Sequence, residues 1–100
     1  MEVKKINEKE FVEVIKERKV LIDCFATWCG PCKMMSPILD EVAKEVKNCK
    51  FYKLDVDEAE EIASEYGIYS IPTLLLFEDG KLKDQSIGLI SKDDIKEMIK

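Results

Sequence analysis

Apolar and polar residues along the chain follow two kinds of pattern, one typical of strands and the other of helices. The run from Val20 to Phe25 is nearly continuously apolar, as in a central strand covered on both faces, and we expect such a strand to have parallel neighbours. Shorter strand patterns occupy residues 3–6 and 50–56. Between Thr73 and Ile87, two strand patterns flank a turn at Asp79-Gly80 and predict an antiparallel hairpin.

Four segments carry apolar residues at helical spacing. Asn7 and Ser91, each followed three residues later by an acidic residue, are typical of helix starts, and Gly67 is typical of a helix end. Pro37 falls inside the second helix, where the periodicity continues in register, so we expect a kink and one lost hydrogen bond rather than a break. The predicted helices run from about Glu8 to Arg18, from Pro31 to Val46, from Glu58 to Tyr66 and from Ser91 onward.

This order of elements predicts an α/β fold with a central five-stranded mixed β-sheet, flanked by four helices on both faces. A chain of 100 residues is long enough for one hydrophobic core but not for two. Residues 1–100 are therefore expected to form a single domain.

The charge balance and the cysteine content narrow the possible functions. A net charge of −5 argues against binding to nucleic acid or to anionic membranes. No apolar run approaches the roughly 18 residues of a membrane span. Met1 is followed directly by Glu2 and Val3 rather than by a signal peptide, so the reducing cytoplasm is the expected compartment. Four cysteines without any histidine favour redox or metal chemistry over a disulfide framework.

Cys29 and Cys32 are the candidates for redox chemistry, since they lie three positions apart where a strand pattern gives way to a helix. Residues i and i+3 of a helical turn have Cβ atoms roughly 5–6 Å apart, against about 3.5–4.5 Å in a relaxed disulfide, so closure is possible with some strain. Pro31 suits the first helical position and leaves Cys29 at the positive end of the helix, where thiolate is favoured. We expect Cys29 to attack and the more shielded Cys32 to resolve.

Other interpretations of the cysteines are a structural disulfide, a metal site and idle core thiols. A bridge across two intervening residues closes so short a loop that it adds little stability. A zinc site would need all four sulfurs, and Cys24 and Cys49 do not form the second CxxC pair that is usual there. Cys24 is interpreted as a small core residue on the face opposite Asp23, and Cys49 is expected to be partly exposed.

Asp23 and Lys53 are charged residues inside two strands that are predicted to be buried. A carboxylate six residues before Cys29 is expected to be desolvated, which raises its pKa toward neutrality and suits it to take the proton of Cys32. The alternative interpretation is that Asp23 is solvated at the edge of a strand and takes no part in proton transfer. Lys53 either tunes the titration of Asp23 or extends its stem along the core with its head in water.

Pro72 precedes a strand that is predicted to be central, and proline cannot serve an inner ladder. We therefore expect it at the first residue of the strand or in a special bond. A cis Ile71-Pro72 bond would free the backbone of Ile71 to pair with an extended substrate segment, although the residues alone favour trans. An apolar rim around the sulfurs is predicted from Trp28, Pro31, Ile71, Ile87 and Gly88.

The chain strongly resembles the thioredoxin family over essentially its whole length. The residues that carry the resemblance keep the family's order and spacing: Asp23, Trp28-Cys29-Gly30-Pro31-Cys32-Lys33, Pro37, Lys53, Ile71-Pro72-Thr73, Gly80 and Gly88. The resemblance implies the thioredoxin fold and an oxidoreductase that reduces disulfides of client proteins. It also implies that Cys29 is the nucleophile, Cys32 the resolving thiol, Asp23 the buried proton-transfer carboxylate and Pro72 a cis proline, with Trp28, Gly30, Pro31 and Lys53 in support.

Client proteins and a thioredoxin reductase are the partners that the resemblance implies, for a chain expected to be monomeric. No nucleotide or flavin motif is present for internal recycling, and no cofactor is expected. Cys24, Phe25 and Ser70 depart from the family's usual residues, which bears on client preference and on the pairing with a reductase. The alternative function is that of a non-catalytic binding or scaffold subunit with the same fold.

Overall fold

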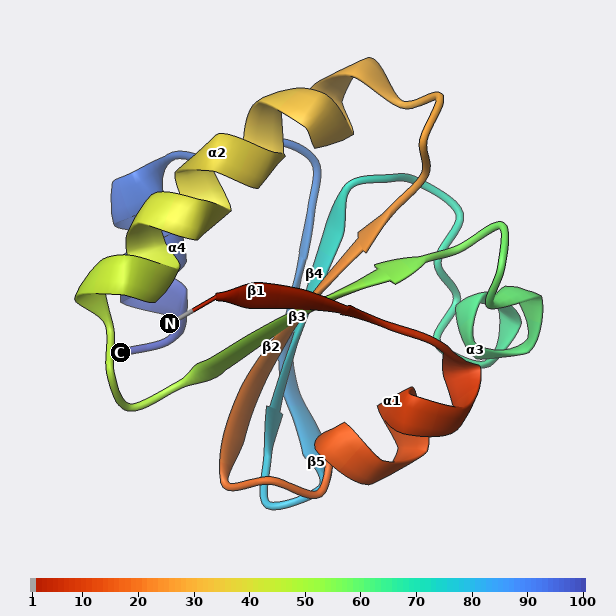
Figure 1. Cartoon of the computed structure of the whole chain (residues 1–100), viewed down its shortest axis with the longest axis horizontal. Helices are drawn as coiled ribbons and strands as arrows, with labels where there is room; N and C mark the ends of the chain where they lie inside the picture. Colours follow the sequence, from red (N-terminus) through yellow and green to blue (C-terminus); the bar gives the residue numbers. More distant parts are fainter. Residues whose placement is uncertain (1) are drawn as a thin grey trace.

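The structure is a computed structural model that describes residues 2–100 and, within them, five strands and four helices (Figure 1). In chain order, the elements are β1 (Val3–Ile6), α1 (Glu8–Val14), β2 (Lys19–Phe25), α2 (Gly30–Glu45), β3 (Lys50–Asp55), α3 (Glu60–Glu65), β4 (Thr73–Glu78), β5 (Lys81–Ile87) and α4 (Lys92–Met98).

The five strands form one mixed sheet in the order β1-β3-β2-β4-β5, which confirms the predicted sheet. β3 is parallel to both β1 and β2, whereas β4 is antiparallel to β2 and to β5. The expectation that β2 has parallel neighbours is thus wrong on the β4 side. β3 ends beside Phe25 and β4 begins beside Cys24, so the connection through α3 leaves and re-enters the sheet at the same end. β4 therefore runs in the opposite direction.

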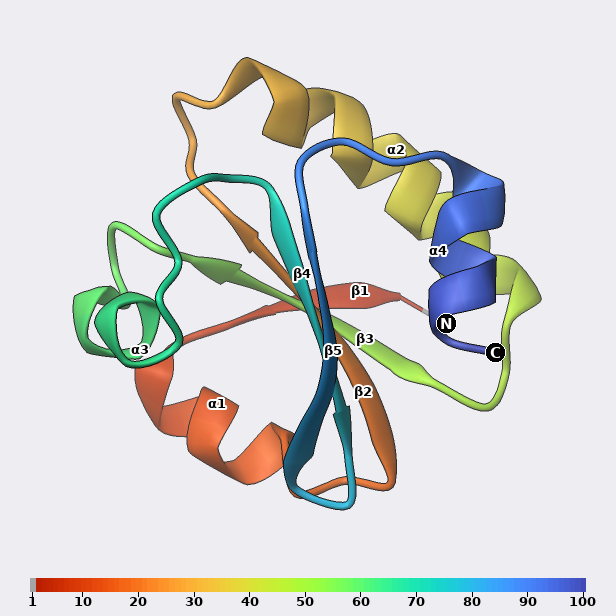
Figure 2. The same cartoon turned by 180° about the vertical axis from the view of Figure 1, so that it is seen from behind.

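Helices cover both faces of the sheet, α2 and α4 on one face and α1 and α3 on the other (Figures 1 and 2). A hydrophobic core lies on each face of the sheet, and β2 contributes side chains to both because its side chains alternate between the faces. Val20, Ile22 and Cys24 pack on the α1/α3 side, and Leu21 packs on the α2/α4 side. Both faces of β2 are buried, as its continuous apolar sequence predicts. Asp23 shares a face with Leu21 and hence faces α2.

The helix caps are confirmed, but two helix boundaries are not. The backbone N–H of Glu10 donates to the Asn7 side chain (2.8 Å), and Gly67 has φ +64° after α3. α1 ends at Val14 rather than Arg18, because the chain then tightens into turns in which each N–H bonds three residues back, as in Lys16 to Glu13 (3.2 Å). α3 begins at Glu60 rather than Glu58, since residues 55–59 form a turn in which the N–H of Glu58 donates to the carbonyl of Asp55 (3.1 Å).

α2 is the longest helix within residues 2–100 and runs through Pro37 to Glu45 without a break. Its last turn is tied to α4 by the Glu45 carboxylate, which pairs with both Lys92 and Lys96. Its N-terminus carries the two cysteines of interest, Cys29 as the N-cap residue and Cys32 in the first turn, so the packing of α2 on the sheet fixes their position. None of the helices in residues 2–100 is both long enough and apolar enough to cross a membrane.

Candidate active site

Cys29 and Cys32 form a disulfide at the N-terminus of α2, with their Cα atoms 5.3 Å apart. Cys29 is the N-cap residue of the helix, and Pro31 lies in its first turn, where the missing N–H of proline costs no hydrogen bond. The backbone N–H of Cys32 donates to Sγ of Cys29 over 3.1 Å. In the dithiol form, the same N–H and the positive end of the helix favour a thiolate at Cys29.

The two cysteines are equally buried, each with 4% of its surface exposed, so the prediction that Cys32 is the more shielded is wrong. Cys29 is covered because Ile71 packs against the small cluster formed by Ala26 and the two cysteines, with the Ile71 carbonyl oxygen 3.8 Å from Sγ of Cys29. What distinguishes the two sulfurs is their surroundings. Cys29 has the N–H donor of the helix, whereas Cys32 lines a cavity that also contains Asp23.

Asp23 is buried, with 2% of its surface exposed, as its place in an apolar strand predicts. Its Oδ1 atom has no hydrogen-bond partner. Desolvation raises the pKa of Asp23 to about 7, an effect that the positive charge of Lys53 opposes and the negative charge of Asp40 reinforces. A carboxyl group with this pKa can exist in either protonation state near neutral pH, which is what a proton-transfer group at a thiol requires.

Lys53 lies beside Asp23 in the parallel register of β2 and β3. Its Nζ atom is 5.9 Å from the centre of the Phe25 ring, and its side chain is half-buried. The charge of Lys53 lowers the pKa of Asp23 relative to burial alone, in agreement with the first interpretation of Lys53. The Phe25 ring faces the ammonium group of Lys53 rather than its stem.

The Ile71-Pro72 peptide bond is cis, as the resemblance implies and contrary to the expectation from the residues alone. Pro72 directly precedes β4, and its carbonyl accepts the N–H of Gly88 over 2.8 Å. Ile87 pairs with Thr73 across the hairpin. Ile71, Pro72, Ile87 and Gly88, distant in sequence from the cysteines, thus form one edge of the site.

Trp28 is held at the rim by a residue that sequence reasoning missed. Its indole Nε1–H donates to the carboxylate of Asp57 over 2.8 Å, and 69% of its surface remains exposed. The backbone N–H of Asp57 in turn donates to the buried Asp55 carboxylate over 2.9 Å. The signal that could have found Asp57 is its position just after β3, because the carboxyl ends of adjacent parallel strands meet at one edge of a sheet.

Cys24 and Cys49 lie in the two different cores, on opposite faces of the sheet. Cys24 is a core residue as predicted, but the partial exposure predicted for Cys49 is wrong, because the side chain enters the α2/α4 core and only 1% of its surface is exposed. Burial raises the pKa of both thiols, that of Cys49 to about 11. The four sulfurs do not converge, and residues 2–100 contain no group of three or more potential metal ligands.

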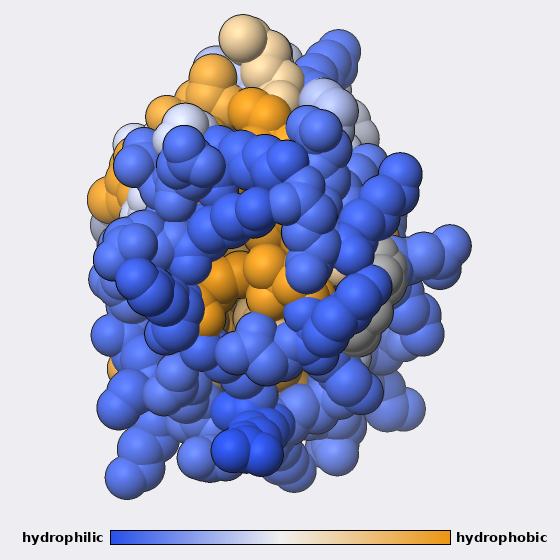
Figure 3. Space-filling view, turned by 90° about the vertical axis from the view of Figure 1, so that its left-hand side faces the viewer, coloured by the Kyte–Doolittle hydropathy of each residue, from blue (hydrophilic) through white to orange (hydrophobic). Residues whose placement is uncertain are grey.

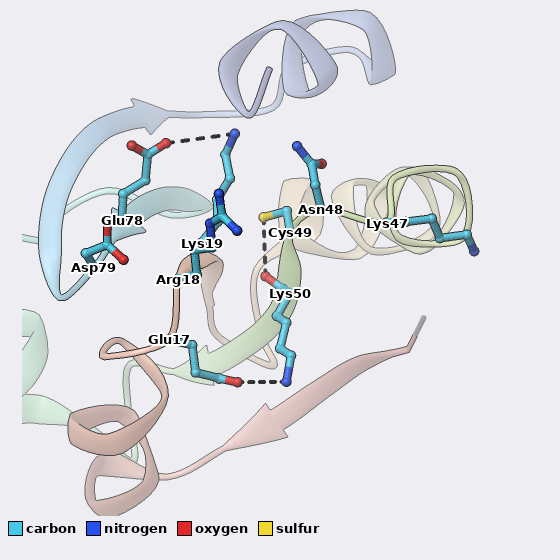
Figure 4. Close-up of a pocket in the computed structure, with 9 residues that line it drawn as sticks. All are labelled: Glu17, Arg18, Lys19, Lys47, Asn48, Cys49, Lys50, Glu78 and Asp79. Atoms are coloured by element: carbon cyan, nitrogen blue, oxygen red, sulfur yellow. Dashed lines mark hydrogen bonds and ion pairs between the residues drawn. The ribbon is translucent and has the colours of Figure 1, made fainter.

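A larger cleft of about 800 Å³ lies at the opposite end of the sheet, where β2 and β3 begin. Figure 3 shows a ring of hydrophilic residues around a hollow with apolar residues inside it. Four cations line the cleft, and two of them, Lys19 and Lys50, pair with Glu78 (3.8 Å) and Glu17 (2.8 Å), respectively (Figure 4). Cys49 is the single sulfur-bearing residue that lines it, so this cleft does not provide a redox pair.

Comparison with known proteins agrees with this geometry. The family description Thioredoxin matches residues 2–100. The chain belongs to the thioredoxin family. The thioredoxin of Mycoplasmoides gallisepticum is 48% identical over 95 residues, which cover 94% of this chain and 95% of that protein. The thioredoxin of Bacillus subtilis is 41% identical over 100 residues, which cover 99% and 96% of the two chains.

Solved structures confirm the thioredoxin fold. A mutant thioredoxin from Halobacterium salinarum superimposes with a TM-score of 0.91 at 37% identity, covering 98% of this chain and 88% of that one. Oxidised mitochondrial thioredoxin 3 of Saccharomyces cerevisiae gives 0.88 at 39% identity, covering 97% and 92%. As a member of the thioredoxin family with a Cys29–Cys32 pair, the chain is a thiol-disulfide oxidoreductase.

Proposed function

We propose that this protein reduces disulfide bonds in client proteins and is itself recycled by a thioredoxin reductase, so that it carries electrons in cell redox homeostasis in the cytoplasm. The observation that carries the proposal is the position of the Cys29–Cys32 pair at the start of α2, with the N–H of Cys32 aimed at Sγ of Cys29. This arrangement stabilises a thiolate, which is the attacking species in thiol-disulfide exchange.

In the first step, the Cys29 thiolate attacks one sulfur of the client disulfide. A mixed disulfide between Cys29 and the client forms, the client S–S bond breaks, and the released client thiolate takes a proton from water. The chain supplies room for this approach, because Gly30 beside the sulfur is exposed and a Cβ atom there would meet no other part of the chain within 4 Å. The packing of the protein therefore does not require the absence of a side chain at Gly30.

In the second step, Asp23 takes the proton of Cys32, and the resulting thiolate attacks Sγ of Cys29. The Cys29–Cys32 bond forms as the mixed disulfide breaks, and the second client sulfur leaves as a thiol after protonation. The client has then gained two electrons from the dithiol and two protons from water, while the Cys29 proton has gone to water and the Cys32 proton to Asp23. The reductase restores the dithiol by supplying the same number of electrons and protons.

The exposed rim is the surface that we assign to the client. Trp28 and Ile87 expose 69% and 64% of their surfaces, large fractions for apolar side chains. Ile71 packs against the two cysteines, and we assign its backbone to pair with an extended client strand. The binding residues of this proposal are Trp28, Ile71, Pro72, Ile87 and Gly88.

Reduction of insulin disulfides with dithiothreitol as electron donor tests the proposal. The unsubstituted chain is expected to turn over, and Cys32→Ser is expected to accumulate a mixed disulfide at Cys29, because the resolving thiol is missing. Asp23→Asn is expected to slow reduction at least about ten-fold near neutral pH while keeping the fold, since an amide cannot accept the proton. Cys49→Ala, which removes a thiol outside the site, serves as the control with normal turnover. A stable client complex without turnover would favour the scaffold alternative.

A further inference from the structure

A cavity of about 230 Å³ lies beneath the disulfide, between the sheet and the first turns of α2. Asp23 lines it from β2, Lys53 from β3, and Cys32 and Ser36 from α2. Cys32 and Ser36 are four positions apart, so both lie on the same face of the helix. The cavity thereby brings the resolving cysteine, its proposed base and one hydroxyl group together.

One polar atom in this cavity, Oδ1 of Asp23, is buried and has no hydrogen-bond partner in the protein. Ser36, a half-buried residue, lines the same cavity with its hydroxyl group. Buried polar groups of this kind are usually satisfied by water, which needs a polar site with room for it. A volume of about 230 Å³ holds several water molecules.

We propose that this cavity is a water-filled proton path in which the Ser36 hydroxyl links Asp23 to solvent during resolution by Cys32. The inference rests on the proposed function, because it concerns the route of the proton that leaves Cys32. It makes Ser36 a positioning residue: it acts through water on Asp23 and does not itself touch the client.

The proton balance along this path is simple. Asp23 accepts the Cys32 proton as the Cys29–Cys32 bond forms, and it must lose that proton before the next cycle. A serine hydroxyl can accept one proton from water on one side while donating its own to water on the other, so it relays a proton without changing its charge. The proton leaves to bulk water, and no further reactant is required.

Ser36 is better placed for this role than the other groups near the cavity. The Lys53 ammonium has donors but no acceptor, so it cannot relay a proton while it is charged. Thr27 is exposed at the rim, where bulk water already solvates it. Two charged side chains act on Asp23, those of Lys53 from β3 and Asp40 from α2. Two further titratable groups lie close by: Lys33 lines the cavity, and Cys24 follows Asp23 on β2.

The experiment compares Ser36→Ala, which removes the hydroxyl, with Ser36→Thr, which keeps it. Ser64→Ala, a serine substitution on the exposed surface of α3, is the matched control. The pKa of Asp23 is measured by NMR of its carboxyl carbon in the dithiol form, and the pH profile of insulin reduction is measured in parallel. Ser36→Ala is expected to raise the pKa of Asp23 by about half a unit, the effect of losing one water-mediated hydrogen bond to the carboxylate.

In Ser36→Ala, the pH profile of insulin reduction should shift to higher pH by the same amount. In Ser36→Thr and Ser64→Ala, the profile should not shift. If Ser36 had only a structural role, Ser36→Ala would change the free energy of unfolding but would shift neither the pKa of Asp23 nor the pH profile of insulin reduction. An Asp23 pKa and pH profile in Ser36→Ala that match those of Ser64→Ala would overturn the inference while leaving the proposed function intact. If the unsubstituted chain reduced no insulin, the proposed function would fail, and the Asp23 pKa in the dithiol form would still decide whether Ser36 acts on this carboxyl.

Discussion

At the scale of single residues, Asp23, the proton acceptor of the proposed function, also makes the stability of the fold depend on pH. Its pKa of about 7 exceeds its ordinary value of 3.8, so between these pH values the native state binds more protons than the unfolded state. Stability contributed by the protonated carboxyl is therefore lost as pH rises from about 4 to about 7. A pKa of about 7 in place of 3.8 corresponds to about 4 kcal/mol of unfolding free energy.

Asp23→Asn should remove this pH dependence, because the amide stays neutral at every pH. We expect the variant to match the unsubstituted chain in urea unfolding at pH 4 and to be more stable at pH 8 by up to about 4 kcal/mol. Both measurements are made on the dithiol form, so that the redox state is constant. A gain in stability of the same size at both pH values would show that the carboxyl does not titrate between them.

How far individual residues could be predicted depends on whether their neighbours are local in sequence. Asp23 stands out because it interrupts an apolar strand, and a buried carboxyl must shift its pKa. Asp57 does not stand out, since an acidic residue in a loop is ordinary and its partner Trp28 lies 29 positions away. The burial of Cys49 was also missed, because its position at the start of a strand does not reveal which helices cover it.

At the scale of elements, the junction between β3 and α3 positions the rim of the active site. The Asp55 carboxylate accepts the N–H of Asp57, which fixes the turn, and the Asp57 carboxylate then accepts the indole N–H of Trp28. Two carboxylates from one turn thus orient a side chain that belongs to the loop after β2. This junction holds Trp28 at the surface that we assign to the client.

Asp57→Ala should release the Trp28 indole and weaken client binding more than chemistry. We expect the KM for insulin to rise about two- to five-fold with a smaller change in kcat, the size of effect that one hydrogen bond supports. Trp28 is the single tryptophan of the chain, so its fluorescence reports the change directly. Asp57→Asn keeps an oxygen acceptor and should behave like the unsubstituted chain. An unchanged emission spectrum in Asp57→Ala would contradict the orienting role.

The order and type of the elements follow from the sequence more completely than their ends and directions. Periodicity, the caps at Asn7 and Ser91 and the turn at Asp79-Gly80 are local signals, and each is confirmed. The direction of β4 and the end of α1 are not local. They depend on the end of the sheet at which the connection through α3 returns and on where a helix tightens into turns, which apolar periodicity does not encode.

At the scale of the whole molecule, the disulfide and the larger cleft lie at opposite ends of the sheet. The carboxyl ends of β2 and β3, the start of α2 and the cis Pro72 meet at the disulfide, in the position where open α/β sheets commonly place their sites. The larger cleft lies at the other end, where Lys19 and Lys50 are paired with carboxylates. Cavity size alone would have pointed to that cleft as the active site. The residues that line the two cavities point instead to the smaller one, beside the disulfide.

The distribution of the four sulfurs over the molecule leads to a prediction about their reactivity. In the reduced protein at pH 7, iodoacetamide should modify Cys29 first, with an apparent pKa below the ordinary value of about 8.5, because a helix N-terminus and the Cys32 N–H stabilise its thiolate. Cys24 and Cys49 should stay unmodified until urea unfolds the chain, since burial raises the pKa of both thiols. Mass spectrometry of proteolytic fragments measures the order of modification. Modification of Cys49 in the folded protein as fast as that of Cys29 would mean that the thiolate is not favoured at the helix start, and the proposed attack by Cys29 would lose its physical basis.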